Sequence, residues 1–344
     1  MKTKKIFFIF IIIFSILLTS FTFYIYQVIK TPNILVGKED RYLLIPTDAS
    51  FKNVQDSLFD KNYVQDLVSF SLVAKFMDYD EQIKPGLYKL KKNMTNIDAV
   101  RLLRSGQQAA VNITFNNIRL KEDLAEKITR NLEISEEDFL HQLKDTSVAT
   151  TYGFDQETIM TMFIPNTYEV FWDVLPGKLL DRMHMEYKKF WNEERLAKAR
   201  KLNLNPTEVS ILASIVQAES IKADERPKIA GVYLNRLERG IALQADPTLV
   251  YAAGDFTIKR VLNVHKELDS PYNTYMYAGL PPGPINLPSI GAIDAVLNYQ
   301  DHNYIYFCAK ADFSGYHAFA STLSEHLKNA RKYQVALDKA KLYR

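Results

Sequence analysis

The chain has 344 residues, about the length of two average domains, and 47% of them are hydrophobic and 24% charged. We therefore expect more than one folded unit of ordinary globular composition. Once three lysines at the N-terminus are set aside, basic and acidic residues are equal in number, which argues against nucleic-acid binding. Cys308 is the only cysteine, so an internal disulfide is excluded. Its place in the strand-like run 304–309 favours a buried core thiol over a nucleophile.

Residues 6–29 form an apolar run without a charge, and its length suffices to cross a bilayer as a helix. A cleavable signal peptide is the alternative, but its apolar core is shorter and ends in small residues. Here aromatic residues occupy the distal end of the run, which favours an uncleaved single-pass anchor. Three lysines lie within residues 1–5 and only Lys30 follows closely. The positive-inside rule therefore predicts a cytoplasmic tail at 1–5 and export of the rest.

The remainder is predicted to be α+β. Residues 30–41 are expected to be a linker, and residues 42–110 a small α/β unit. This unit has strand patterns at 42–46 and 86–90 and helical patterns at 54–58, 64–77 and 96–104. A larger part at 111–344 begins with a strand at 112–116, continues with helices through about residue 143, and has a helical stretch at 178–202. The boundary near 110 has no Pro-rich or Ser-rich linker.

A helix with strong start signals begins after Asn205, which suits the N-cap and is followed by Pro206 and, three residues on, by Glu208. Within it, Glu219 shares a helical face with an apolar stripe. The stripe consists of Leu212, Ile215 and Val216. Burial raises the pKa of a carboxyl group, as a general acid near neutral pH requires. Alternatively, Glu219 turns to solvent or pairs with a base such as Arg226 or Arg236.

The segments after this helix are rich in polar groups. Asp224 is expected to cap a helix that Gly240 ends, and Gln244 and Asp246 follow in a loop beside Pro247. Such a loop carries binding groups or is a plain turn. Residues 270–289 contain five prolines and two glycines, which excludes regular structure. Their tyrosines and amides suit the faces and hydroxyls of a sugar, while a structural cover is the alternative.

Other chemistries have little support. The six histidines form no HExxH motif and no zinc-like spacing, so we expect neither a metal site nor another cofactor. Ser214 lies mid-helix rather than in a GxSxG turn, which disfavours a serine hydrolase. We expect His317 to be a hydrogen-bonded structural histidine at the start of a strand rather than a ligand or second proton shuttle.

Several segments are recognisable together. They are ILASIVQAES, ERPKIAGVYLNRLERGIALQADPTLVYAAG, SPYNTYMYAGLPPGPI and YIYFCAKADFSGYHAF, followed by a helix that begins TLSEH. In this order they resemble the endolytic murein transglycosylase family, or YceG-like proteins. The resemblance covers nearly all of the predicted exported chain.

The resemblance implies a single-pass enzyme of the bacterial inner membrane, with a LysM-like subdomain at 42–110 and a catalytic domain at 111–344. Such an enzyme cuts nascent peptidoglycan strands between N-acetylmuramic acid and N-acetylglucosamine, leaves 1,6-anhydro ends and terminates elongation. Its partners would be glycan strands and penicillin-binding synthases. The alternatives are a non-catalytic wall-binding scaffold for synthases and, less favoured, a membrane-anchored peptidase.

The resemblance also implies that Glu219 is the catalytic acid, while Gln217 stands where many relatives have a second glutamate. One carboxyl group suffices if an internal hydroxyl of the sugar makes the attack. The motif positions expected to contact substrate are Asn235, Arg236, Gln244, Asp246, Tyr272, Asn273, Thr274 and Tyr275. Glu225 and Arg226 also fall on motif positions. Residues 286–289, NLPS, depart from the small residue, proline and glycine of many relatives.

Overall fold

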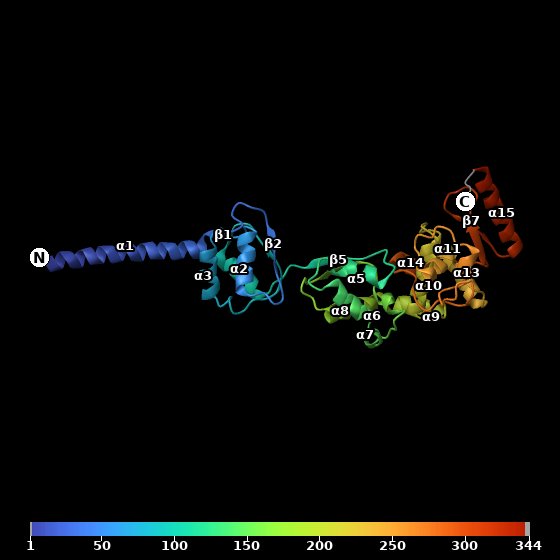
Figure 1. Ribbon diagram of the computed structural model, residues 1–344, viewed down its shortest axis with the longest axis horizontal. Helices are drawn as coiled ribbons and strands as arrows, with labels where there is room; N and C mark the ends of the chain where they lie inside the picture. Colours follow the sequence, from blue (N-terminus) through green and yellow to red (C-terminus); the bar gives the residue numbers. More distant parts are fainter. Residues whose placement is uncertain (1, 341–344) are drawn as a thin grey trace. The chain divides into compact units, whose positions relative to one another are not determined.

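The computed structural model describes residues 2–340 and places them in two compact units (Figure 1). Unit 1 extends to Asn112 and also contains residues 131–134 and 169–174. Unit 2 contains Ile113–Arg130, Ser135–Tyr168 and the residues from Leu175 onward. Helices and strands occur in both units, which confirms the predicted α+β class. The LysM-like character of the smaller unit stays a prediction.

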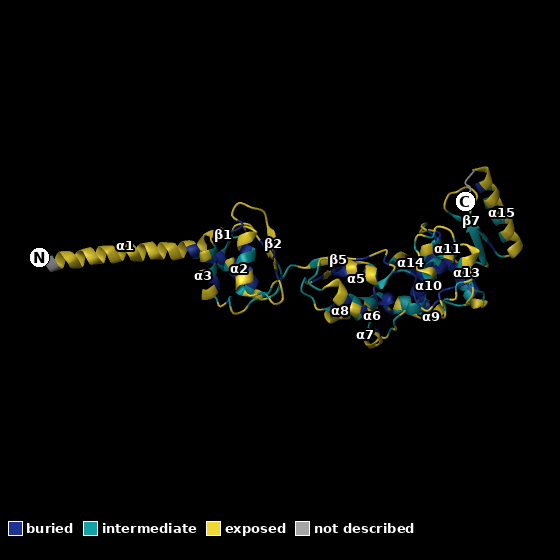
Figure 2. Cartoon of the chain, in the orientation of Figure 1, coloured by how far each residue is buried: buried dark blue, intermediate teal, exposed yellow. Residues whose placement is uncertain are grey.

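Helix α1 (Lys2–Lys30) is long and apolar enough to cross a membrane, as the sequence predicts. Its side chains are exposed over most of its length (Figure 2). Residues 30–41 are not a linker. They contain β1 (Pro32–Ile34), which pairs antiparallel with β4 (Met94–Thr95), and Ile34 and Leu35 are buried in the core of unit 1.

The rest of unit 1 is built on β2 (Arg41–Ile45), which pairs antiparallel with β3 (Gly86–Leu90). Helices α2 (Phe51–Asp60) and α4 (Asn96–Ser105) pack on these strands, and α3 (Leu67–Phe76) packs on both helices. Alternate residues of both strands point inward, so Leu43 and Ile45 meet Tyr88 and Leu90 in one core. The strands and helices predicted between residues 42 and 104 are all present.

Strands β5 (Val111–Thr114) and β6 (Thr167–Val170) pair with each other. The first half of unit 2 is helical and contains α5 (Lys121–Thr129), α6 (Glu136–Lys144), α7 (Thr146–Thr151), the 3-10 helix η1 (Ile159–Met162), α8 (Pro176–Phe190) and α9 (Glu193–Lys201). The helical stretch predicted at 178–202 is therefore two helices. They separate because the Asn192 side chain accepts a hydrogen bond from the Arg195 amide and starts α9 anew.

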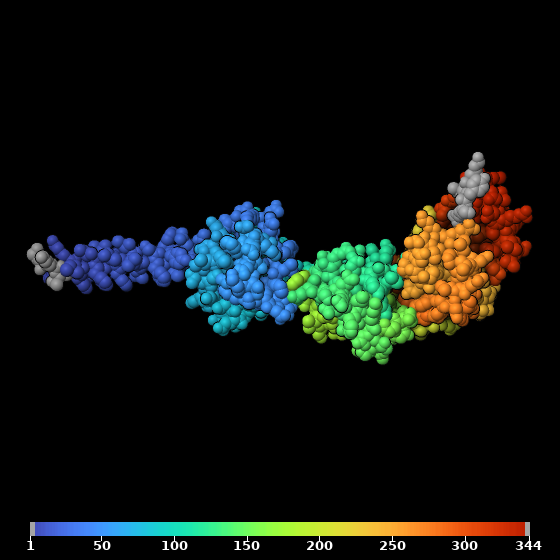
Figure 3. Space-filling view, in the orientation of Figure 1, coloured from blue at the N-terminus to red at the C-terminus, as the bar shows by residue number. Residues whose placement is uncertain are grey.

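The core of unit 2 surrounds α10 (Pro206–Glu219), whose residues 209–216 are all buried (Figure 2). Asn205 and Glu208 form the predicted capping box. Helix α10 packs against α11 (Arg226–Glu238), α12 (Asp246–Ala253) and α14 (Ile290–Leu297). The segment between α12 and α14 contains only the short α13 (Asn263–Lys266), and residues 270–289 have no regular structure, as predicted. In Figure 3 this segment, coloured orange, forms a broad part of the surface of unit 2.

The chain ends in β7 (Tyr306–Ala309), β8 (His317–Ala320) and α15 (Leu323–Lys339). The two strands form an antiparallel hairpin in which Cys308 lies opposite Ala318. Cys308 is only partly buried, so the expectation of a buried core thiol is wrong. The burial that it has raises the pKa of its thiol, which favours the protonated form.

Candidate active site

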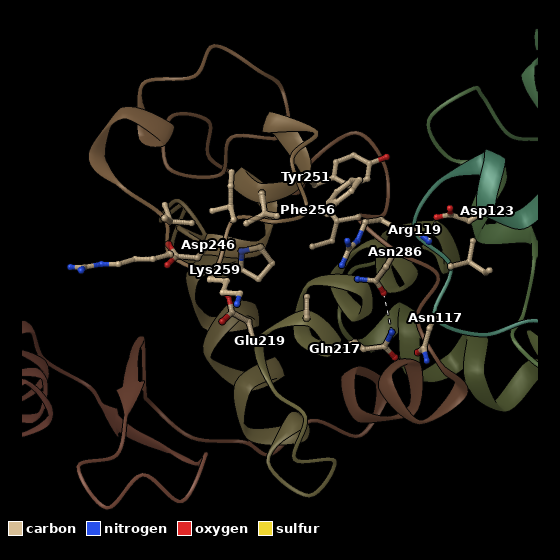
Figure 4. Close-up of a pocket in the computed structure, with 18 residues that line it drawn as sticks. Asn117, Arg119, Asp123, Gln217, Glu219, Asp246, Tyr251, Phe256, Lys259 and Asn286 are labelled. Carbon is tan, nitrogen blue, oxygen red and sulfur yellow. Dashed lines mark hydrogen bonds between the residues drawn. The ribbon is translucent and has the colours of Figure 1, made fainter. Parts of the chain in front are cut away.

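Unit 2 contains a cavity of about 930 Å³ that holds Glu219 (Figure 4). This volume lies in the range of small-molecule sites, about 300–1,000 Å³. Glu219 and Asp246 lie side by side on one part of its wall, whereas Gln217 and Asn286 lie further along it (Figure 4). The cavity therefore brings together the end of α10, the start of α12 and two irregular segments.

Glu219 is the last residue of α10, and its side chain is partly accessible from the cavity while protein atoms crowd it on the other sides. The hydroxyl of Tyr233 on α11 donates a hydrogen bond to Oε1 of Glu219 at 2.7 Å. Tyr233 is fully buried, and its ring packs edge-on against Phe307. Tyr233 thus fixes one oxygen of the carboxyl group and leaves the other for the cavity.

The environment raises the pKa of Glu219 to about 7. Burial is the main cause, because desolvation disfavours the charged form, and the nearby charge of Asp246 acts in the same direction. The hydrogen bond from Tyr233 and the charge of Arg236 act in the opposite direction. Glu219 can therefore hold a proton near neutral pH and also release it, as a group serving as both acid and base must.

Replacing Tyr233 by Phe should shift the pH dependence of any reaction in which Glu219 acts as the acid. The variant keeps the ring but loses the donor that stabilises the charged form of Glu219, so the pKa of Glu219 should rise. A reaction that uses protonated Glu219 as its acid is present below this pKa and is lost as the pH rises through it. The alkaline limb of kcat/KM should therefore move to higher pH in Tyr233→Phe. A limb that stays in place or moves to lower pH would contradict this assignment.

Asp246 is the first residue of α12, not part of a free loop, and its carboxylate is exposed to the cavity. The hydroxyl of Tyr275 donates to Oδ1 of Asp246 at 2.5 Å. Thr274 holds the turn before the helix, because its hydroxyl accepts from the Ala245 amide at 3.0 Å and its carbonyl accepts from the Gln244 amide at 2.9 Å. Thr274 and Tyr275 therefore position Asp246 beside Glu219.

Three further motif residues hydrogen-bond to backbone carbonyls. Asn273 is fully buried, and its amide donates to the carbonyls of Lys266 and Leu268. Arg236 is buried and donates to the carbonyls of Ala242, Leu243 and Ile305. Asn235 donates to the carbonyls of His302 and Tyr304. The polar groups of these three residues thus bond to backbone carbonyls, and the substrate contacts predicted for them stay a prediction.

Tyr272 and Gln244 also lie outside the wall of the cavity. The hydroxyl of Tyr272 donates to Glu157 at 2.7 Å, and its mostly buried ring packs on Tyr251, so its role is to support a residue that does line the cavity. Gln244 is exposed and has a positive φ of 51°. Its backbone makes the turn that leads into α12, and the substrate contact predicted for it stays a prediction.

Gln217 connects α10 to the irregular segment 286–289. Its Nε2 donates to Oδ1 of Asn286 at 3.0 Å, and its Oε1 accepts from the Ser289 amide at 2.8 Å. Asn286 in turn donates to the Ser214 carbonyl at 2.9 Å, which fixes the orientation of its amide. The two departures from the family pattern, at 217 and in 286–289, therefore contact each other.

Glu225 and Arg226 hold the turn between α10 and α11. Glu225 is buried, and its carboxylate accepts from the His317 amide and lies 2.7 Å from Nδ1 of His317. Arg226 donates to the carbonyl of Ser220 at 3.0 Å. His317 is thus the structural histidine at a strand start that the sequence predicts. Helix α11 begins at Arg226, and Glu225 stands at its cap position in place of Asp224.

The sequence patterns missed a large part of the cavity wall. Asn117 and Arg119 come from the irregular segment before α5, and Phe256 and Lys259 from the segment after α12. The guanidinium of Arg119 stacks over the ring of Phe256 at 4.2 Å. Neither segment has periodicity or a motif that would have marked it. Among the described residues, no group of three or more His, Cys, Asp or Glu side chains is arranged to hold a metal ion.

Comparison with known proteins places this chain in a family. The family model described as "YceG-like family" matches residues 43–332. An endolytic murein transglycosylase of Bacillus subtilis is 30% identical over 307 residues, which cover 84% of this chain and 83% of that protein. One of Streptococcus pneumoniae is 24% identical and covers 96% of this chain, which spans 65% of that protein's length.

A solved structure agrees with these relatives. The crystal structure of a YceG-like protein from Listeria monocytogenes is 26% identical, with a TM-score of 0.54, and covers 84% of this chain and 98% of that one. The family model alone matches well over half of the chain. With Glu219 in its cavity and these matches along most of its length, the chain belongs to the YceG-like family.

Proposed function

We propose that this chain is a membrane-anchored endolytic peptidoglycan transglycosylase in which Glu219 is both acid and base. The observation that carries the proposal is the pKa of Glu219, which burial raises to about 7 inside a cavity of ligand size. The relatives in Bacillus subtilis and Streptococcus pneumoniae bear the name endolytic murein transglycosylase. A non-catalytic wall-binding scaffold would have no use for a carboxyl group tuned in this way.

The reaction needs one proton donor and no water. Glu219 protonates the oxygen that leaves with N-acetylglucosamine, and the bond from this oxygen to C1 of N-acetylmuramic acid breaks. The Glu219 carboxylate then takes the proton of the muramic C6 hydroxyl, whose oxygen bonds to C1. The product is a 1,6-anhydro end, and Glu219 regains its proton. Since the attacking hydroxyl belongs to the same sugar, its high effective concentration replaces a second catalytic carboxylate.

Asp246 supports this reaction electrostatically. Positive charge develops at C1 as the glycosidic bond breaks, and a fixed carboxylate in the same cavity stabilises it. The hydrogen bond from Tyr275 keeps Asp246 in place. The charge of Asp246 also opposes ionisation of Glu219, so that it favours the acid form at the start of each turnover.

We expect Arg119 to contact the substrate and to contribute to its binding. It lines both the main cavity and an adjoining cavity of about 330 Å³, which also share Tyr251 and Asn286. Arg119→Gln should raise KM about tenfold, the value of one charged hydrogen bond, with little change in kcat. Steady-state kinetics on uncrosslinked strands would measure this. Arg130→Gln is the control, because Arg130 pairs with Glu126 outside the cavity; an equal KM in all three proteins would remove Arg119 from the binding site.

The membrane arrangement follows from α1. We propose a single pass through the bacterial inner membrane with the N-terminus in the cytoplasm, supported by the lysines at the N-terminal end of the span. Both units would then face the peptidoglycan. Penicillin-binding synthases, which make the nascent strands, are the partners that we propose.

The decisive experiment is digestion of purified peptidoglycan by the full-length chain in detergent, followed by mass spectrometry of the products. We expect 1,6-anhydro ends on fragments of many lengths, since an endolytic enzyme cuts within strands. Reducing ends without anhydro products would make the protein a hydrolase. Binding without released fragments would support the scaffold, and cleaved stem peptides would support a peptidase.

A further inference from the structure

Helix α3 in unit 1 has an apolar face that the protein does not cover. Val68, Leu72 and Phe76 follow one another at intervals of four residues, so they share one side of the helix. Their exposed fractions are 66%, 50% and 89%. The opposite side, with Phe70 and Ala74, is fully buried in the core. A contiguous row of large apolar side chains on the surface indicates an interaction site.

Buried hydrogen bonds join α3 to the C-terminal end of α1. The side chain of Asn96 donates to the carbonyl of Val28 on α1 at 3.0 Å and to the hydroxyl of Ser69 on α3 at 3.1 Å. Val28 itself belongs to the core of unit 1. The first turns of α3 and the last turn of α1 are therefore held together, and Figure 1 shows α3 on the side of unit 1 that α1 enters.

The position of Val28 sets the distance of α3 from the bilayer. Tyr24 and Tyr26 are exposed near the end of the apolar run, where aromatic residues mark the membrane interface. Val28 lies two residues further on, which is about 3 Å along a helix. The first turn of α3, linked to Val28 through Asn96, is thus at the level of the lipid headgroups.

We propose that the Val68, Leu72 and Phe76 face of α3 lies in the surface of the bilayer that α1 spans. A helix with one apolar face buries it at the boundary between headgroups and acyl chains, and the exposed side chains of α3 match this environment. Unit 1 is then held at the membrane by two contacts, the spanning helix and the interfacial helix. This inference rests on α1 and unit 1 alone and does not depend on the catalytic proposal.

The test uses the full-length chain in lipid nanodiscs, with Cys308→Ser as background and one new cysteine labelled with an environment-sensitive fluorophore. Leu72→Cys reports on the α3 face, and Tyr42→Cys is the matched control, because Tyr42 is also 50% exposed but lies on β2. Lipids with a nitroxide near the headgroup should quench the label at 72 several-fold more than the label at 42. Neither substitution touches the core, so both variants should fold.

Two results would overturn the proposal. The first is equal quenching at both positions, with equal access of the labels to iodide in the water. The second is protection of the label at position 72 from iodide that appears only when two chains share a nanodisc. That result would assign the apolar face of α3 to a contact with a second copy. Protection that persists with one chain per disc supports the bilayer as the occupant.

Discussion

Glu219→Gln should reduce the rate of strand cleavage by about 10³-fold, within the range for loss of a general acid. The amide has nearly the same shape and can still accept the hydrogen bond from Tyr233, so the fold and the cavity should persist. It has no proton to give to the leaving oxygen and cannot take one from the C6 hydroxyl. Release of anhydro fragments from purified strands, followed over time by mass spectrometry, measures the loss.

Glu238→Gln provides the control for this loss, because Glu238 is an exposed carboxylate on α11 outside the cavity. It should cleave at the wild-type rate. Strand binding by Glu219→Gln should remain close to that of the wild type, so that the effect lies in kcat. A variant that retains full activity would exclude Glu219 from the mechanism, whatever the other residues do.

Arg236→Ala should lower the thermal stability of the protein by about 10 °C. The guanidinium donates to the carbonyls of Ala242, Leu243 and Ile305, and its removal takes this donor away from all three acceptors. Such a loss costs about 3 kcal/mol or more, and in a unit of this size each kcal/mol is worth about 2–4 °C. Differential scanning calorimetry of the full-length chain in detergent measures the shift.

Arg236→Lys separates charge from geometry. Lysine keeps the positive charge but cannot bond three carbonyls in a fixed plane, so most of the stability should still be lost. If Arg236 were a substrate ligand, both variants would melt like the wild type and KM alone would rise. That result would restore the assignment that the sequence motif suggested.

The features that the sequence predicted best have strong local signals. A pattern within one helix is enough to predict each of three features: the length of α1, the capping box at Asn205 and the direction of the Glu219 side chain. The pKa of Glu219 could be given a direction in advance, because an apolar face determines burial. Its second cause, the charge of Asp246, depends on how α12 packs on α10 and is not encoded in either segment alone.

Motif residues were harder to assign because a motif does not distinguish chemistry from scaffold. Asn273 and Thr274 are small polar residues in a proline-rich segment, and such side chains commonly satisfy nearby backbone groups. Both prove to be buried and bonded to the backbone. Arg119, in contrast, lies about a hundred residues before Glu219 in an irregular segment, and only the tertiary fold brings it to the cavity. Strand β1 was missed because three residues give too short a pattern.

The contact of Gln217 with Asn286 and Ser289 has an evolutionary consequence. A glutamate at 217 could still accept from the Ser289 amide but would direct its other oxygen at Oδ1 of Asn286. Asn286 cannot turn its amide without losing the bond to Ser214. Homologous chains should therefore covary here: those with an acidic residue at 217 should lack an acceptor at 286, and glutamine and asparagine should be inherited as a pair.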